Sequence, residues 1–178
     1  MTRARVLAAL LVFALGGCDG PSSTISDMRV DNAMQLLRYA AGQGPVLVEV
    51  AGEPFGGQAR FDPAGLLALV VEAYQPVSNP PLTFTLDKAK AGDAGYRFVW
   101  LIDPGLGFTI DGTCAGQVPP RAAKKADWVE VRAVFCGPNR SLSAVYGRTR
   151  RPRGDDDAGW GHLVRQMSRQ LVGERLQG

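Results

Sequence analysis

The segment 45–50 (Pro-Val-Leu-Val-Glu-Val) places the tightest constraint on the fold. Its valines favour an extended strand, and the glycines of the following segment 52–57 end it. The run is nearly apolar on both of its faces. A strand of this composition is typical of a sheet that is covered on both sides. The sequence therefore predicts a sheet with packed elements around this strand.

Three segments have helical periodicity or helical start signals. The first begins after Ser26 or Asp27 and runs to about residue 41, where glycines stop it. The second opens at Asp62-Pro63, a capping residue followed by proline at the first helical position, and runs to residue 74. The third covers about 157–172 and carries one apolar stripe. Three helices are therefore predicted.

Four further segments have the composition or alternation of strands. They are 82–86, 96–102, 128–136 and 141–146, with a hairpin turn at 137–139. The connection 103–127 is rich in glycine and gives no clear element. The predicted fold class is α+β: a single domain with a mostly antiparallel sheet of about five strands packed with three helices.

The N-terminus has the layout of a secretory signal. Arg3 and Arg5 are followed by an apolar stretch and by two glycines. The apolar stretch is too short for a membrane-spanning helix, which needs about 20 residues. Its end, Leu-Gly-Gly-Cys at 15–18, resembles the lipobox of bacterial lipoproteins. The resemblance implies cleavage before Cys18, lipidation of its thiol, and hence a membrane anchor; an ordinary cleaved signal is the alternative.

The expected organisation is a signal peptide at 1–17, a lipidated polar tether at 18–26, and a periplasmic α+β domain at 27–178. With Cys18 lipidated, Cys114 and Cys136 remain as an even pair in an exported chain. Exported proteins form disulfides in oxidising compartments, so a structural bridge between these two cysteines is predicted. Two free thiols or a redox pair are the alternatives, but the sequence has no C-x-x-C motif.

Charge and motifs exclude several functions. The net charge of +3 falls close to neutral once Arg3 and Arg5 are removed, which argues against nucleic-acid binding. The single histidine, His162, lies in a predicted helix without a hydrolase motif, and no zinc site is expected. The acidic run 155–157 lacks calcium-loop spacing and is expected to cap the last helix. No metal site and no cofactor are predicted.

Two more groups of side chains bear on binding. The arginines at 148, 150, 151 and 153 are expected in a solvated loop, with contact to anionic lipid headgroups as the alternative. Trp100, Trp128 and Trp160 fall on apolar stripes and are expected in the core.

The candidate partner surface is the segment 52–57, which carries Glu53 and Phe55. An exposed Phe55 would mark a partner or ligand site, whereas a buried Phe55 would close the end of the sheet. The connection 103–127 is a further candidate for this surface.

Beyond the lipobox, several short motifs resemble a group of small proteobacterial lipoproteins without an assigned function. They are 44–50 with Gly52-x-Pro54-Phe55, Phe84-Thr85, Arg97-Phe98-Val99-Trp100 and Cys136. This resemblance implies no activity and no site residues. The order of elements is also similar to that of envelope accessory lipoproteins and assembly factors, which is an analogy of fold.

The leading hypothesis is a membrane-anchored, non-enzymatic envelope lipoprotein that binds another envelope protein. One alternative is a cell-envelope hydrolase that uses carboxylates such as Glu49, Glu53 or Asp103. Another is a carrier of a small ligand or lipid, which would need an apolar cavity. Asp19 resembles a retention signal and favours the periplasmic side of the inner membrane over the outer membrane.

Overall fold

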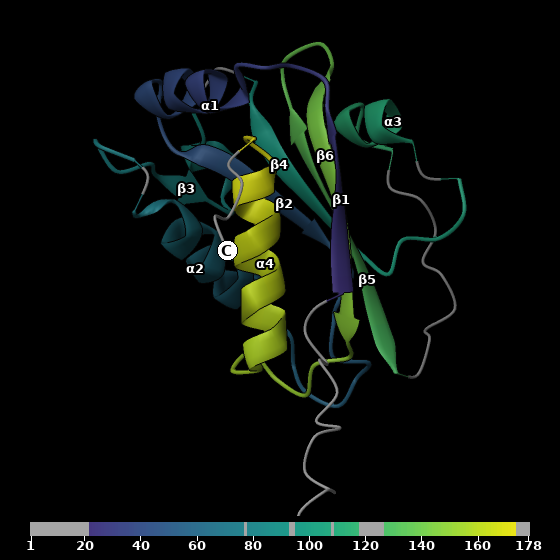
Figure 1. The fold of residues 1–178 in the computed structure, drawn as a ribbon. Coiled ribbons are helices and arrows are strands. Elements are labelled where there is room, and N and C mark those ends of the chain that lie inside the picture. Colours follow the sequence, from purple (N-terminus) through teal and green to yellow (C-terminus); the bar gives the residue numbers. More distant parts are fainter. Residues whose placement is uncertain (1–21, 77, 93–94, 108, 118–126, 174–178) are drawn as a thin grey trace, which may run out of the picture.

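The structure, a computed structural model, describes residues 22–76, 78–92, 95–107, 109–117 and 127–173 (Figure 1). In chain order the elements are β1 (Ser22–Met28), α1 (Ala33–Gly42), β2 (Val46–Ala51), α2 (Pro63–Tyr74), β3 (Phe84–Thr85), the 3₁₀-helix η1 (Lys88–Lys90), β4 (Arg97–Ile102), α3 (Ile110–Cys114), β5 (Trp128–Cys136), β6 (Ser141–Arg150) and α4 (Ala158–Gln170). The α+β class predicted from the sequence is confirmed.

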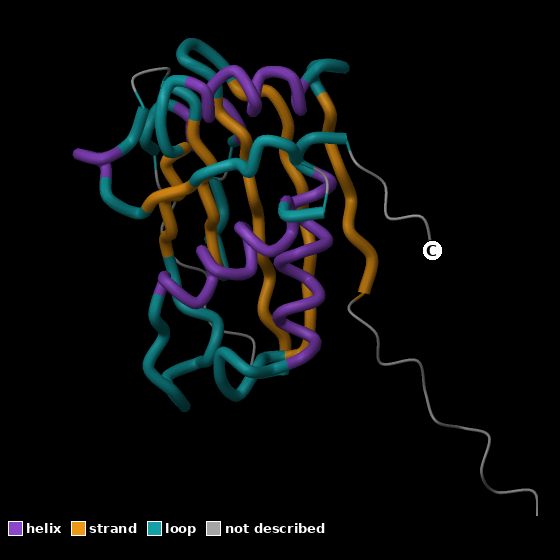
Figure 2. Tube along the Cα trace, turned by 90° about the vertical axis from the view of Figure 1, so that its left-hand side faces the viewer, coloured by secondary structure: helices purple, strands orange, loops and turns teal. Residues whose placement is uncertain are grey.

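The described strands form one mixed sheet in the order β1-β6-β5-β4-β2-β3, and Figure 2 shows them side by side. β2 pairs in parallel with both β3 and β4, and the other three pairings are antiparallel. The prediction of about five strands and three helices is therefore corrected to six strands and four α-helices in the described residues. The parallel pairings require two connections that return the chain to the same end of the sheet, one through α2 between β2 and β3 and one through η1 between β3 and β4.

The larger core lies between one face of the sheet and the helices α1, α2 and α4. We call this the inner face. Alternate residues of β4 and β5 point into it, because side chains alternate along a strand. The sheet contributes Val46, Val48, Phe98, Trp100, Ile102, Val129, Val131, Ala133 and Phe135, and the helices contribute Leu37, Leu66, Val70, Trp160, Leu163 and Met167 among others. This predicted alternation of β4 and β5 is confirmed.

A smaller apolar cluster lies on the opposite, outer face of the sheet. It contains Val99, Leu101, Val134, Cys136 and Ala144, with partly buried residues of α3 packed against it. Figure 1 shows α3 on the side of the sheet away from α2 and α4. α3 thus covers part of the outer face, over β5 and β6. The outer side of β2 lines an open hollow at Leu47 and Glu49, so the predicted cover on both sides of this strand is present only in part.

The N-terminal part of the domain differs from the prediction. The segment 22–26 was expected in the polar tether 18–26, but Ser22–Met28 forms the edge strand β1. This strand pairs antiparallel with β6, from Ser22 opposite Arg148 to Met28 opposite Ser143. The first helix therefore starts later, at Ala33. The edge of β6 offers backbone partners that a polar segment can use, and composition alone does not reveal such pairing. Cys18 and the leader lie outside the described residues.

The two predicted helix caps are present. The Asp62 side chain accepts a hydrogen bond from the backbone N–H of Ala64 at 2.9 Å, with Pro63 at the first turn of α2. Asp157 accepts one from the backbone N–H of Trp160 at 3.0 Å. Asp157 therefore caps α4, as its position ahead of the last helix predicted.

Candidate functional site

The predicted disulfide between Cys114 and Cys136 is confirmed, with the two Cα atoms 5.4 Å apart. It joins the end of α3 to the end of β5. The connection 103–127 was expected to hold no clear element, but it contains the five-residue α3, which starts where the Thr109 hydroxyl accepts a hydrogen bond from Gly112 N–H at 3.0 Å. The bridge therefore pins a short helix, rather than a loop alone, to the sheet.

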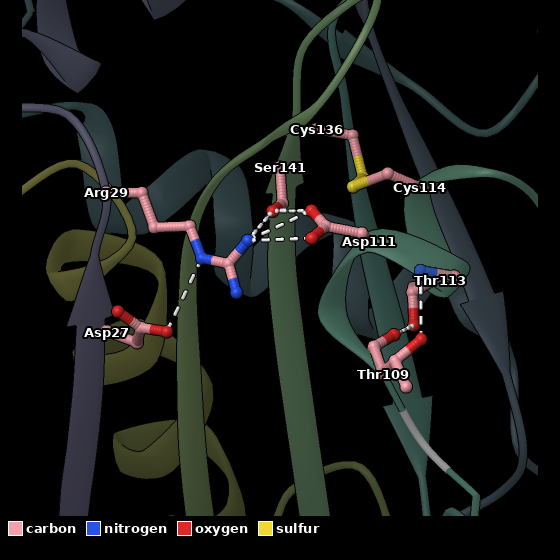
Figure 3. Close-up of polar contacts among 9 residues, drawn as sticks. Asp27, Arg29, Thr109, Asp111, Thr113, Cys114, Cys136 and Ser141 are labelled. Carbon is pink, nitrogen blue, oxygen red and sulfur yellow. Dashed lines mark hydrogen bonds and ion pairs between the residues drawn. A yellow bond between two sulfur atoms is a disulfide. The ribbon is translucent and has the colours of Figure 1, made fainter.

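A polar cluster ties α3 to the N-terminal strand (Figure 3). Arg29, directly after β1, donates from Nη1 to both carboxylate oxygens of Asp111 at 3.0 Å and to the Ser141 hydroxyl at 2.8 Å. Ser141 in turn donates to Asp111 at 2.5 Å. Three segments that are distant in sequence thus meet at the end of the sheet where β1 ends and β6 begins.

The electrostatics of this cluster follow from its hydrogen bonds. The bond from Ser141 and then the Arg29 guanidinium hold the pKa of the Asp111 carboxyl below its usual range. The same carboxylate raises the pKa of Arg29. Hydrogen bonds and opposite charge both favour the ionised forms, so Asp111 and Arg29 remain charged near neutral pH.

Open hollows flank the C-terminal end of α3. One, of about 550 Å³, is lined by residues that include Arg29, Asp111, Ala115, Asn139 and Arg140. Another, of about 590 Å³, lies on the other side of α3 over β2 and β4. Its lining includes Leu47, Glu49, Lys88, Arg97 and Gly116. We call the two hollows together with residues 114–116 the α3 surface.

Part of the α3 surface is held by an ion pair on the outer face. Arg97 of β4 donates from Nε to Glu49 of β2 at 3.0 Å, and its Nη2 donates to the carbonyl oxygen of Cys114. The guanidinium therefore links both strands to the last turn of α3. With the disulfide and the Arg29 cluster, this is the third tie that positions α3.

A second arginine–carboxylate pair lies at the opposite end of the sheet. Arg151 donates to Asp103 at 2.8 Å, to the Pro54 carbonyl at 3.0 Å and to the Trp128 carbonyl at 2.7 Å. The other Asp103 oxygen accepts a hydrogen bond from the backbone N–H of Glu130 at 3.0 Å. Asp103, a predicted candidate for acid–base chemistry, is thus held by an arginine and a backbone group.

The predicted partner surface around Phe55 is corrected. Phe55 is fully buried and packs edge-to-face on Phe61 with ring centroids 5.8 Å apart. The carbonyl oxygen of its neighbour Pro54 accepts a hydrogen bond from Arg151. Glu53 is half-buried. Phe55 therefore closes the end of the sheet, the alternative that the sequence had left open, and does not serve as an exposed anchor.

The arginine cluster is also placed differently from the prediction. Arg148 and Arg150 lie on β6 rather than in a loop, and the Arg151 side chain is buried in its ion pair. Arg148 stacks over the ring of Trp128, with its guanidinium carbon 5.2 Å from the ring centre. Trp128 is only half-buried, whereas Trp100 and Trp160 are in the core as predicted.

The remaining polar candidates are not brought together. His162 is exposed on α4. Burial and the neighbouring Asp62 and Asp156 raise the pKa of Asp155. In the part of the chain that the structure describes, no three histidine, cysteine or acidic side chains are grouped as a metal site would require, and no helix has the length and apolar character to cross a bilayer.

Comparison with known proteins gives little. Neither the protein families nor the curated proteins provide a match. Among solved structures, a PelC dodecamer from Paraburkholderia phytofirmans is similar at 8% identity and a TM-score of 0.45, covering 86% of this chain and 99% of its own. A variant of the same protein gives 8% identity, a TM-score of 0.46, and coverage of 85% and 98%. Similarity at this level carries no argument about this chain.

Proposed function

We propose that this chain is a lipid-anchored envelope protein, and that its α+β domain is a non-enzymatic binding or accessory module for another envelope component. The observation that carries the proposal is the construction of the α3 surface. A five-residue helix is held by a disulfide, by Arg29 and by Arg97, and open hollows remain on both of its sides. A rigid surface of this kind suits recognition, because little order has to be gained on binding.

The position of β1 determines where the α3 surface would lie relative to the membrane. Ser22 is four residues after Cys18, so an extended chain allows at most about 14 Å between the lipidated residue and the start of the sheet. The seven residues of β1 then rise by about 23 Å towards Arg29. A lipid on Cys18 would therefore hold the Ser22 end of the domain at the membrane and present the α3 surface away from it.

The separation of Glu49 and Asp103 argues against a hydrolase that pairs these two carboxylates. Glu49 lies opposite Val99 in the sheet, and Asp103 is four residues farther along, which is about 13 Å. Paired glycosidase carboxylates are separated by about 5–9.5 Å. Each of the two is also paired with its own arginine. They do not converge on one substrate position.

The carrier alternative receives no comparable support. The largest side chains of the inner core, among them Trp100, Trp160 and Phe98, are fully buried and pack against one another. The hollows named above open on the outer surface instead. A ligand of this domain would therefore bind at its surface, which again favours a binding module.

The proposed location is the periplasmic side of the envelope, with the inner membrane favoured by Asp19. Fractionation of membranes from cells that express the wild type and Asp19→Ser tests this directly. We expect the variant to move to the outer membrane. An unchanged distribution would remove Asp19 as a sorting signal without affecting the anchor.

Site-specific photo-crosslinking in cells tests the binding role. A photoreactive residue at Asn139 or Ala115, both exposed on the α3 surface, should give one reproducible protein adduct. The matched control is His162, exposed on α4 on the helical side of the sheet. Adducts only at His162, or none at either α3-surface position, would contradict the proposal.

A further inference from the structure

The outer face of β5 and β6 carries a basic and aromatic patch. It consists of Trp128, Arg132, Tyr146, Arg148 and Arg150. Cross-strand pairing places Trp128 opposite Arg150 and Arg132 opposite Tyr146, so these side chains share one face. Arg132 stacks over Tyr146 at 5.3 Å and Arg148 over Trp128 at 5.2 Å. Two of its arginines, Arg148 and Arg150, are exposed. We call this group the β5–β6 patch.

Two acids of the nearby run, Asp155 and Asp157, lie beside the helices rather than on the patch. Asp157 caps α4 and Asp62 caps α2, and both helices pack on the inner face. The Asp155 carboxylate lies beside Gly65 of α2, because a Cβ built at position 65 would be 3.2 Å from it. These three carboxylates thus lie beside α2 and α4, whereas the arginines occupy outward-facing positions of β5 and β6. Glu130 of β5 lies on the patch face opposite Arg148, and the three arginines of the patch outnumber it.

The patch also lies at the anchored end of the domain. Ser22 pairs with Arg148 across the sheet edge. Because Ser22 is four residues after Cys18, Arg148 is within about 20 Å of the proposed lipid attachment, counting one interstrand spacing of about 5 Å. The Arg148 end of the patch therefore lies near the region in which the headgroups of the anchoring membrane would lie.

We propose that the β5–β6 patch rests on anionic phospholipid headgroups of the membrane that holds Cys18; this rests on the lipid anchor proposed above. Arginine binds phosphate through the edge of its guanidinium, while stacking on a ring uses its face, so both contacts are compatible. Tryptophan and tyrosine favour the headgroup level of a bilayer, where their rings are half-solvated. In this arrangement the lipid anchor limits the distance between the domain and the membrane. The patch determines which face of the sheet contacts the membrane.

The test uses the full mature lipidated protein reconstituted in vesicles. Lipids with a nitroxide on the headgroup quench tryptophan fluorescence at short range, and Trp128 is the accessible tryptophan because Trp100 and Trp160 are buried. Quenching is compared between phosphatidylcholine vesicles and vesicles with added phosphatidylglycerol. Inorganic phosphate added to phosphatidylcholine vesicles forms a third arm. Flotation of each sample reports whether the protein is anchored at all.

We expect stronger quenching with phosphatidylglycerol and no effect of inorganic phosphate. Arg148→Gln with Arg150→Gln should reduce the population of the surface-bound state by about fivefold for each arginine. Arg148→Lys with Arg150→Lys keeps the charge and should retain the lipid dependence. Lys88→Gln with Arg140→Gln, at exposed positions of the α3 surface, is the matched control and should leave it unchanged.

The outcomes separate the two proposals. Protein that fails to float with vesicles contradicts the anchor itself. Protein that floats but shows equal quenching in both kinds of vesicle overturns the headgroup contact and leaves the anchor intact. An effect of inorganic phosphate equal to that of phosphatidylglycerol would also overturn it, because the patch would then be a site for soluble anions.

Discussion

The Arg151 guanidinium and the Asp103 carboxylate form a nearly buried ion pair at 2.8 Å, with side-chain exposures of 6% and 11%. The pair joins the end of β4 to the chain that follows β6, and Arg151 also holds the Pro54 carbonyl of the segment after β2. This end of the sheet is therefore fixed by charge and hydrogen bonds in addition to the packing of Phe55.

Arg151→Met should destabilise the fold strongly. The substitution keeps most of the side-chain volume but leaves Asp103 buried without its partner, and breaking a buried pair in this way costs about 3–5 kcal/mol. The free energy of unfolding in urea measures the loss. Arg153→Met, at an exposed position, is the control and should change it by less than about 0.5 kcal/mol. Equal effects of the two substitutions would mean that the buried pair is unimportant.

Loss of the disulfide should lower stability and loosen α3. Closing a loop of this size stabilises a fold by about 3 kcal/mol in the chain-entropy account. Cys114→Ser with Cys136→Ser should lose roughly that amount in urea unfolding. Amide exchange should rise most in α3, since Arg29 and Arg97 are then its remaining ties among those described above. Unchanged exchange in α3 would contradict the role given to the bridge.

The Arg29 cluster should weaken in acid. The pKa of Asp111 is lowered in the folded protein, so its favourable contribution is fully present above the ordinary value of 3.8 and is lost as pH falls through the lower folded value. Carboxyl NMR signals should show Asp111 titrating below 3.8, with amide exchange in α3 rising over the same range. Asp111→Asn should abolish that pH-dependent step. Titration of Asp111 at or above 3.8 would contradict the cluster geometry.

Gly52→Ala should be more harmful than Gly57→Ala. Both glycines have positive φ, at 104° and 85°, so both substitutions strain the backbone by about 1–2 kcal/mol. At position 52 a Cβ would also overlap the backbone of Ile102, while at position 57 it meets nothing within 4 Å. Urea unfolding of the two variants separates strain from overlap. Equal losses would show that the close approach of Gly52 to β4 is not required.

The sequence predicted those elements whose bounds depend on residues close together in the chain. β5 was predicted with both of its bounds, because alternation over nine residues and a following turn define it. α2 began where Asp62-Pro63 indicated. The disulfide followed from the count of cysteines in an exported chain.

The remaining elements depend on contacts between distant segments. β1 pairs with the exposed edge of β6, which its own composition does not indicate. The parallel arrangement of β2, β3 and β4 depends on two crossing connections, through α2 and through η1. α3 is too short to show helical periodicity, and it contains a glycine. The Arg29–Asp111–Ser141 cluster was missed because its members are 82 and 112 residues apart from Arg29, and no local spacing joins them.

Both proposals depend on a lipid at Cys18 that holds this domain on a membrane. Intact mass of the protein extracted from membranes, measured with and without reduction, tests this anchor. We expect a chain that begins at Cys18, carries the mass of at least two acyl chains, and gains two hydrogens on reduction of the Cys114–Cys136 bridge. A chain without acyl mass, or a Cys18→Ser variant that is still processed and membrane-bound, would contradict it.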